Sequence, residues 1–252
     1  MKLLTLARDL RRRKARERQG LFVAEGLRTV EELLRSPIEV RGVLATPQLV
    51  GSPRGQALLS AIRSRKIGLL ELGESDFKSV ADTDSPQGML AIAVVPPRGI
   101  IDVPRADSFR ILVLDSVQDP GNVGTIIRSA AALGAAATVC LPGTVDLWNA
   151  KVVRSAMGAH FHHLCFDATW DDVEAFRRER DAAIWGADVS GEAVGSLPRP
   201  ARLALVVGNE GSGLSSLSRQ RADCLVSLPI TASADSLNVA VAASLFLYEL
   251  CR

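Results

Sequence analysis

The first stretch of the sequence that could do chemistry is Asp115-Ser-Val-Gln-Asp-Pro-Gly-Asn122-Val-Gly124-Thr-Ile-Ile-Arg128. Two glycines flank Asn122 where a helical pattern begins, and exposed N–H groups and the helix dipole favour an anion at such a place. Arg128 lies further along the same helix among apolar residues, so it either has a partner or reaches solvent along the helix surface. We therefore interpret this stretch as a candidate anion site.

A second stretch, Val206-Val-Gly208-Asn-Glu210-Gly211-Ser-Gly213-Leu214, reads as a strand that enters a glycine-rich turn with one carboxylate. Three glycines within six residues allow positive φ angles and close approach of the backbone to a ligand. The chain has no G-x-x-x-x-G-K-[ST] sequence, which excludes a P-loop, and the order of these glycines differs from the dinucleotide fingerprint G-x-G-x-x-G. The turn therefore belongs to neither of these two nucleotide-binding types.

The third stretch begins at Leu228-Pro-Ile, continues through small polar residues, and restarts as a helix from Val239 to Leu250. Its apolar residues are too dense for a single amphipathic stripe, which predicts a helix that is buried on most of its circumference, in a core or an interface. Ser236 and Asn238 precede this helix, where such side chains most often serve as caps. Because two other unusual loops accompany this stretch, capping alone is too limited an interpretation of Ser236 and Asn238.

The order of strands and helices predicts an α/β protein with two domains and a linker. The expected boundaries are 1–96 for a small α/β domain, 97–108 for a linker rich in Pro and Gly, and 109–252 for a second domain. The second domain contains at least five expected strands with crossover helices, which indicates a doubly wound parallel sheet. Ligands of such sheets bind outside the carboxyl ends of the strands, where the three stretches fall.

The composition excludes several classes of protein. With 252 residues, 47% hydrophobic and 23% charged, the chain is typical of soluble globular proteins. Its four cysteines occur singly and it has three histidines, so the sequence indicates neither a zinc site nor a disulfide framework. No apolar run is long enough to span a membrane and the N-terminus is charged, so we expect a cytoplasmic protein with no membrane partner.

The net charge of +2 conceals an uneven distribution. Residues 1–20 contain eight basic and two acidic residues, a local balance of +6, which leaves −4 for the rest of the chain. A charge run is often only a solvated helix face. Because this run is so dense, we expect a basic N-terminal arm that contacts RNA or phosphate.

Together, the three stretches resemble the motifs of the SpoU/TrmH family of SPOUT RNA methyltransferases. The resemblance extends from about residue 112 to the C-terminus, and the segment 143–159 is also similar to the family between the first two motifs. The N-terminal half, with Phe22-Val-Ala-Glu25-Gly26, resembles the small ribosomal-protein-like RNA-binding domain that many members carry, although this part is less specific. The motifs that carry the resemblance are Asn122…Gly124…Arg128, Gly208-Asn-Glu210-Gly211, Leu228-Pro-Ile, and Ser236-Leu237-Asn238-Val239-Ala240.

The resemblance implies transfer of a methyl group from S-adenosylmethionine to a ribose 2′-hydroxyl, without a metal, by a homodimer whose C-terminal domain contains a deep trefoil knot. It also implies the roles of the site residues. The adenosyl group would be held by Gly208, Leu228 and Leu237. The ribose and its phosphate would be oriented by the catalytic residues Asn122, Arg128, Glu210, Ser236 and Asn238. Because a guanidinium stays charged at ordinary pH, we expect Arg128 to clamp the phosphate and stabilise the alkoxide rather than to act as the base.

Several functions remain open at this point. Large-subunit ribosomal RNA is the expected substrate, and a transfer RNA ribose methyltransferase is an alternative. A non-catalytic RNA-binding module with the same fold is another, although the presence of all five polar residues favours an enzyme. Base methylation fits the motifs less well, and the sequence does not identify the target nucleotide or the proton acceptor.

Overall fold

The computed structural model describes residues 2–231 and 236–251 and divides into two compact units. Unit 1 comprises residues 1–97 and 148–161, and unit 2 comprises residues 98–147 and 162–252. The expected boundaries of 1–96, 97–108 and 109–252 differ from this division at one place in particular. The segment 148–161, which the sequence places in the second domain, packs with the N-terminal unit.

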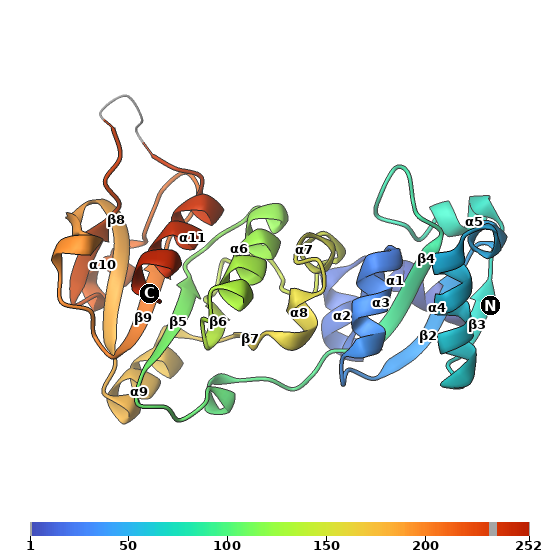
Figure 1. Ribbon diagram of the computed structural model, residues 1–252, viewed down its shortest axis with the longest axis horizontal. Helices are drawn as coiled ribbons and strands as arrows, with labels where there is room; N and C mark the ends of the chain where they lie inside the picture. The colour runs from blue at the N-terminus through green and yellow to red at the C-terminus, as the bar shows by residue number, and fades with distance from the viewer. Residues whose placement is uncertain (1, 232–235, 252) are drawn as a thin grey trace. The chain divides into compact units, whose positions relative to one another are not determined.

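Unit 1 is built on a four-stranded mixed sheet (Figure 1). In spatial order its strands are β1 (Leu21–Glu25), β4 (Met89–Val94), β2 (Val40–Ala45) and β3 (Leu69–Glu71). The pairs of β4 with β1 and β2 are antiparallel, and β2 pairs with β3 in parallel. The helices are α1 (Lys2–Asp9), α2 (Arg13–Gln19), α3 (Leu27–Arg35), the 3-10 helix η1 (Pro47–Gly51), α4 (Pro53–Ser64), α5 (Glu74–Lys78) and α7 (Ala150–Ser155).

Residues 1–20, the basic arm of the sequence, fold into α1 and α2 and pack on the sheet of unit 1. Leu10 is buried in the same apolar cluster as Phe77. Arg16 is also buried, and its guanidinium donates to the carbonyl oxygens of Leu10 at 2.8 Å and Arg11 at 3.0 Å. Deletion of this segment would therefore remove part of the core, so substitution of its exposed charges is the test of the contact with RNA that we expect.

The segment 148–161 is attached to β1 through aromatic side chains. The ring centroid of Phe22 lies 4.5 Å from that of Trp148 and 6.0 Å from that of Phe161. Gly158 has φ +94°, and a Cβ atom there would lie 2.5 Å from the Glu32 Cβ, so the close approach of α3 requires glycine. The aromatic contacts and this glycine account for the membership of the segment in unit 1.

Unit 2 contains a six-stranded sheet in which every observed pair is parallel. In spatial order its strands are β10 (Cys224–Ser227), β8 (Ala183–Ala193), β9 (Arg202–Val207), β5 (Phe109–Leu114), β6 (Ala137–Cys140) and β7 (Cys165–Asp167). Its helices include α6 (Pro120–Ala132), α9 (Trp170–Arg180), α10 (Ser216–Arg221) and α11 (Val239–Leu250); α8 (Ala159–His162) spans the boundary with unit 1, and η2 (Ile100–Asp102) and η3 (Val194–Ser196) are 3-10 helices.

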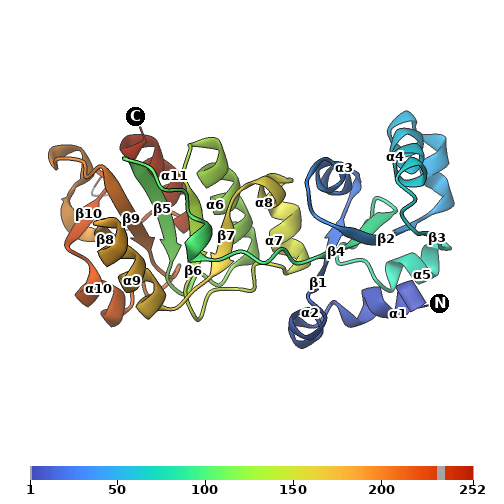
Figure 2. The same ribbon diagram turned by 90° about the horizontal axis from the view of Figure 1, so that it is seen from below.

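Helices cover both faces of this sheet (Figure 2). On one face, Trp170 and Phe176 of α9 pack with Ile111 and Val113 of β5. On the other face, α6 and α11 lie side by side. The predicted α/β fold with a parallel sheet is confirmed, whereas the knot stays a prediction. Within 2–231 and 236–251, no helix has both the length and the apolar character needed to cross a membrane.

The closing helix α11 is buried within the chain on one side only, so the expected burial on most of its circumference requires an interface in addition to the core. Phe246 and Leu250 belong to its buried side. On its other side, Val241, Leu245 and Tyr248 are 48%, 42% and 51% exposed. These three residues follow a helical spacing and form a continuous exposed apolar stripe, hereafter the α11 stripe.

His163 of unit 2 makes the stability of the fold sensitive to acid. Burial and then the Arg98 guanidinium lower its pKa from 6.5 to about 4, and its Nε2 lies 2.9 Å from the Thr138 hydroxyl. Between pH 6.5 and 4 the unfolded chain binds a proton that the folded chain does not, so stability falls as the pH falls. We expect the free energy of unfolding in urea to decrease by on the order of 3 kcal/mol over this range.

The matched variants are His163→Gln and His162→Gln. The first should lose most of this pH dependence, and the second, at an exposed neighbouring position, should retain it. Equal pH dependence in the wild type and the His163 variant would contradict the prediction.

Candidate active site

The central strands β5 and β9 are neighbours, with Leu114 in register with Val207, so the loops at their carboxyl ends lie together. The chain leaves β9 at Gly208, where a Cβ atom would lie 2.2 Å from the carbonyl carbon of Gly213. The backbones of Asn209 and Gly213 then pair through two hydrogen bonds of 2.9 and 3.0 Å. The Asn209 Oδ1 accepts from the N–H groups of residues 211 and 212, and the result is a tight turn.

Asp115, at the end of β5, fastens this turn to the first loop. Its carboxylate is buried and accepts from the Ser215 N–H at 2.7 Å and from the Ser218 hydroxyl at 2.5 Å. The Asn209 amide adds a second link, because its Nδ2 donates to the Ser116 carbonyl at 2.8 Å. The loops after β5 and β9 are therefore held as one structure.

The Glu210 carboxylate lies where the two loops meet. It accepts from the backbone N–H groups of Gln118 at 3.1 Å and Asp119 at 3.0 Å, and from the Asn122 Nδ2 at 3.0 Å. Burial raises the pKa of Glu210, but hydrogen bonds from the Asn122 amide and from three backbone N–H groups outweigh that effect and hold the pKa below its ordinary value. Glu210 is therefore a fixed anion that orients Asn122.

Asn238 connects the third stretch to the same network. Its Nδ2 donates to the Asn122 Oδ1 at 3.0 Å, while its Oδ1 accepts from the Ala240 and Val241 N–H groups and caps α11. The expected capping role of Asn238 is thus confirmed, and it accompanies a link to Asn122. The result is a hydrogen-bonded chain from Asn238 through Asn122 to Glu210, which we call the amide relay.

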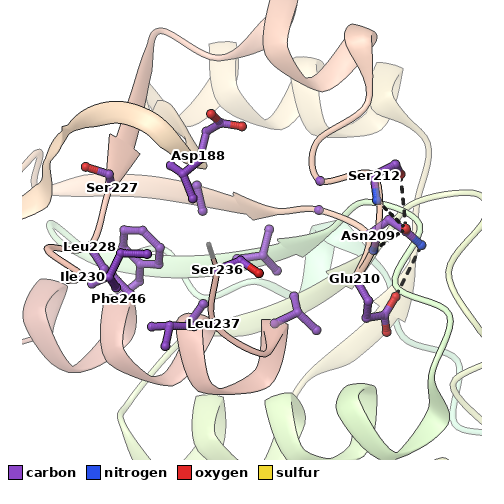
Figure 3. A pocket seen from close by; sticks show the side chains of 18 of the residues that line it. Asp188, Asn209, Glu210, Ser212, Ser227, Leu228, Ile230, Ser236, Leu237 and Phe246 are labelled. Carbon is purple, nitrogen blue, oxygen red and sulfur yellow. Dashed lines mark hydrogen bonds between the residues drawn. The ribbon is translucent and has the colours of Figure 1, made fainter. Parts of the chain in front are cut away.

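A cavity of about 310 Å³ adjoins the amide relay; we call it the site cavity. Figure 3 shows the apolar side chains of Leu228, Ile230 and Phe246 gathered at one end, with Leu237 beside them and the polar turn of Asn209 and Glu210 at the other end. Of the eight residues to which the resemblance assigns a role, five line this cavity: Gly208, Glu210, Leu228, Ser236 and Leu237. The structure therefore brings the second and third stretches to one place.

Arg128 is the one predicted site residue that neither lines the site cavity nor joins the amide relay. It is exposed on α6, the helix that begins beside Asn122. Within the part of the chain that the structure describes, its guanidinium has no hydrogen bond or ion pair. The partner expected from its apolar surroundings is thus not found among these residues.

Phe246, Asp115, Asp188 and Arg219 belong to the site but were not identified from the sequence. Asp115 begins the first stretch but had no assigned role, although an acid at the end of a buried strand is a signal that could have been used. Asp188 lines the site cavity and forms an ion pair with Arg219. Nothing in the sequence links Asp188 with Arg219, because the two residues are distant in the chain.

Two family models match the chain. The SpoU rRNA Methylase family matches residues 110–248, and the MRM3-like substrate binding domain matches residues 5–91. A 23S rRNA (guanosine(2553)-2'-O)-methyltransferase of Bacillus subtilis is 32% identical over 96% of this chain and 93% of its own length. A 23S rRNA (uridine(2479)-2'-O)-methyltransferase of Streptomyces viridochromogenes is 32% identical over 95% of this chain and 85% of its own.

Solved structures with the same fold agree with these matches. The SpoU methyltransferase AviRb from Streptomyces viridochromogenes, in complex with the cofactor AdoMet, aligns over 100% of this chain and 97% of its own, with a TM-score of 0.91 and 28% identity. An AdoMet-bound rRNA methyltransferase from Sinorhizobium meliloti covers 98% of this chain and 93% of its own, with a TM-score of 0.85 and 27% identity. The chain therefore belongs to the SpoU rRNA Methylase family.

Proposed function

We propose that the chain is an enzyme that transfers a methyl group from S-adenosylmethionine to the 2′-hydroxyl of a ribose in large-subunit ribosomal RNA. The observation that carries this proposal is the amide relay of Asn238, Asn122 and Glu210 beside the site cavity. The family and the two 23S rRNA relatives support the reaction and the class of RNA.

The residues of the site cavity fit the proposed cofactor. Leu228, Leu237 and Phe246 offer an apolar wall for a planar adenine, and Gly208 lets the backbone come close to it. S-adenosylmethionine would supply an activated methyl group on a sulfonium. We propose that Gly208, Leu228 and Leu237 hold the adenosyl group.

The catalytic work of the chain is then mainly to position the ribose. We propose that Asn122, Ser236 and Asn238 orient the sugar, with Glu210 fixing the Asn122 amide. Because Glu210 already accepts these hydrogen bonds and has a lowered pKa, it is a poor proton acceptor. Arg128 would bind the RNA phosphate and stabilise the developing alkoxide, while the phosphate or a water molecule takes the proton.

The function is tested by mapping 2′-O-methyl groups in RNA from cells with and without the protein. We expect one ribose of large-subunit ribosomal RNA to lose its methyl group in the cells that lack the protein, and the purified protein with S-adenosylmethionine to restore it. Loss of a methyl group from transfer RNA instead would show that transfer RNA is the substrate. Binding of RNA and cofactor with no methylated product would identify a non-catalytic module.

We also propose a homodimer in which the α11 stripe is the contact. An apolar stripe of this kind is typical of an interface, and its central residue Leu245 is a suitable target for substitution. Sedimentation should give about 54 kDa for the wild type, twice the 26.9 kDa chain, and about 27 kDa for Leu245→Glu.

The control is Leu217→Glu on α10, where a leucine with a similar exposure of 43% lies outside the stripe. It should remain a dimer. A monomeric wild type, or dissociation by both substitutions alike, would remove the assignment of the α11 stripe.

A further inference from the structure

Unit 1 contains a cavity of its own, of about 450 Å³, which we call the unit 1 cavity. Three segments enclose it: the connection from β2 into η1, helix α5, and the loop of residues 84–88 that precedes β4. Leu49 and Phe77 also border it, but both are almost completely buried, so the accessible residues of the lining are mainly polar. Nothing in the reaction proposed above uses this cavity.

The loop of residues 84–88 is anchored to its surroundings on two sides. Gly88 has φ +76°, its carbonyl accepts from the Thr46 N–H at 2.9 Å, and a Cβ atom there would lie 2.3 Å from the Thr46 Oγ1. The neighbouring Gln87 accepts from the Leu27 N–H at 3.0 Å, at the start of α3. The cavity therefore has walls that are built before any ligand arrives.

The polar groups around the unit 1 cavity are of mixed sign. The Glu74 carboxylate accepts from the Gln48 amide at 2.6 Å. The Asp84 carboxylate is exposed and has no hydrogen bond or ion pair within 2–231 and 236–251, and Lys78 on α5 contributes an ammonium group to the lining. Two carboxylates would repel a phosphate, so the lining favours a neutral ligand that donates N–H groups and accepts one hydrogen bond.

Unit 1 also has the charge that brings RNA to it. Its sequence contains 18 Lys and Arg against 11 Asp and Glu, a net charge of +7, whereas unit 2 has 12 against 17, a net charge of −5. Such a field attracts the RNA backbone to unit 1 without selecting a sequence. Selective recognition of RNA relies instead on unstacked bases that are bound by their edges and faces.

From these observations, and on the basis that RNA is the substrate, we propose that the unit 1 cavity binds one unstacked nucleobase of that RNA. Guanine suits the lining best, because its Watson–Crick edge presents two adjacent N–H donors to a carboxylate such as Asp84 and a carbonyl oxygen to Lys78. This base is a second point of recognition, separate from the ribose that is methylated.

The test blocks the cavity and compares RNA affinity at several salt concentrations. Ser85→Trp places a large side chain at the exposed rim, and Ser60→Trp on α4, also exposed and outside the lining, is the matched control. The RNA is deproteinised large-subunit ribosomal RNA, together with short oligouridines that carry a single G, A or C. We expect Ser85→Trp to weaken binding by roughly tenfold or more, with the control unchanged.

The salt dependence separates a base from a phosphate. Loss of a base contact should shift the affinity equally at every salt concentration, whereas loss of a phosphate contact should reduce the slope. Asp84→Asn, which keeps the size of the side chain, should remove the preference for the oligouridine with a guanine. Thermal melting checks that each variant is folded.

Wild-type affinity in a folded Ser85→Trp variant, a reduced salt slope, or no preference for guanine in the wild type would overturn the proposal. Its failure is distinguishable from that of the proposed function. If the protein methylates RNA but the blocked variant binds normally, only this inference fails. If it binds RNA through the cavity and transfers no methyl group, only the enzymatic function fails.

Discussion

Replacement of Arg128 by alanine is expected to lower the rate of methyl transfer by about 10²–10³-fold while cofactor affinity stays the same. Arg128 is exposed on α6, outside the site cavity, so it has no contact through which to hold the cofactor. It shares a helix with Asn122, which places its charge within the same element as the amide relay. Single-turnover rates and calorimetry with S-adenosylhomocysteine measure the two quantities separately.

Arg128→Lys tests the proposed bidentate contact with phosphate. A lysine keeps the charge but lacks the planar fork, so it should restore little of the rate. Arg178→Ala is the control, because this arginine is also exposed, on a helix that covers the opposite face of the sheet. An Arg128→Ala variant with the wild-type rate would show that the mechanism is wrong, even though the family is established.

Elements with a clear hydrophobic periodicity could be predicted from the sequence. Prediction failed where other residues masked that periodicity, where the element was too short to show it, or where packing depended on distant contacts. In residues 2–19, which form α1, α2 and the turn between them, the density of arginine concealed the apolar positions Ala7, Leu10 and Ala15, all of which are buried. The strand β7 has only three residues, too few for an alternating pattern. The segment 148–161 follows β6 in the sequence, and its packing on Phe22 depends on contacts that chain order does not reveal.

In the site, too, local features could be predicted from the sequence and contacts between distant residues could not. Glycines and amides next to the expected strand ends identified the loops, because backbone conformation and helix capping are local properties that a sequence records. The hydrogen bond from Ser218 to Asp115 joins residues 103 positions apart, and it depends on β9 lying beside β5. Strand order of this kind was not deducible from local pattern, so Asp115 and the Asp188–Arg219 pair went unrecognised.

Leu237→Asp is expected to weaken cofactor binding by ~1–3 kcal/mol, roughly a 5- to 150-fold increase in the dissociation constant. Leu237 is half-buried and lines the site cavity with Leu228 and Phe246, so an aspartate would place a charge against an apolar wall. Because RNA binding is assigned to unit 1 and Arg128, RNA affinity should change little. Calorimetry with S-adenosylhomocysteine, and RNA binding without cofactor, measure the two effects.

Two controls separate the loss of an apolar contact from damage to the amide relay, since Leu237 precedes Asn238 in the chain. Leu237→Met keeps the apolar wall and should bind cofactor nearly as well as the wild type. Leu217→Asp makes the same change in charge at an exposed position outside the site cavity and should leave binding unaltered. Undiminished affinity in Leu237→Asp would place the adenine elsewhere, whereas a comparable loss in Leu237→Met would trace the effect to the position of Asn238.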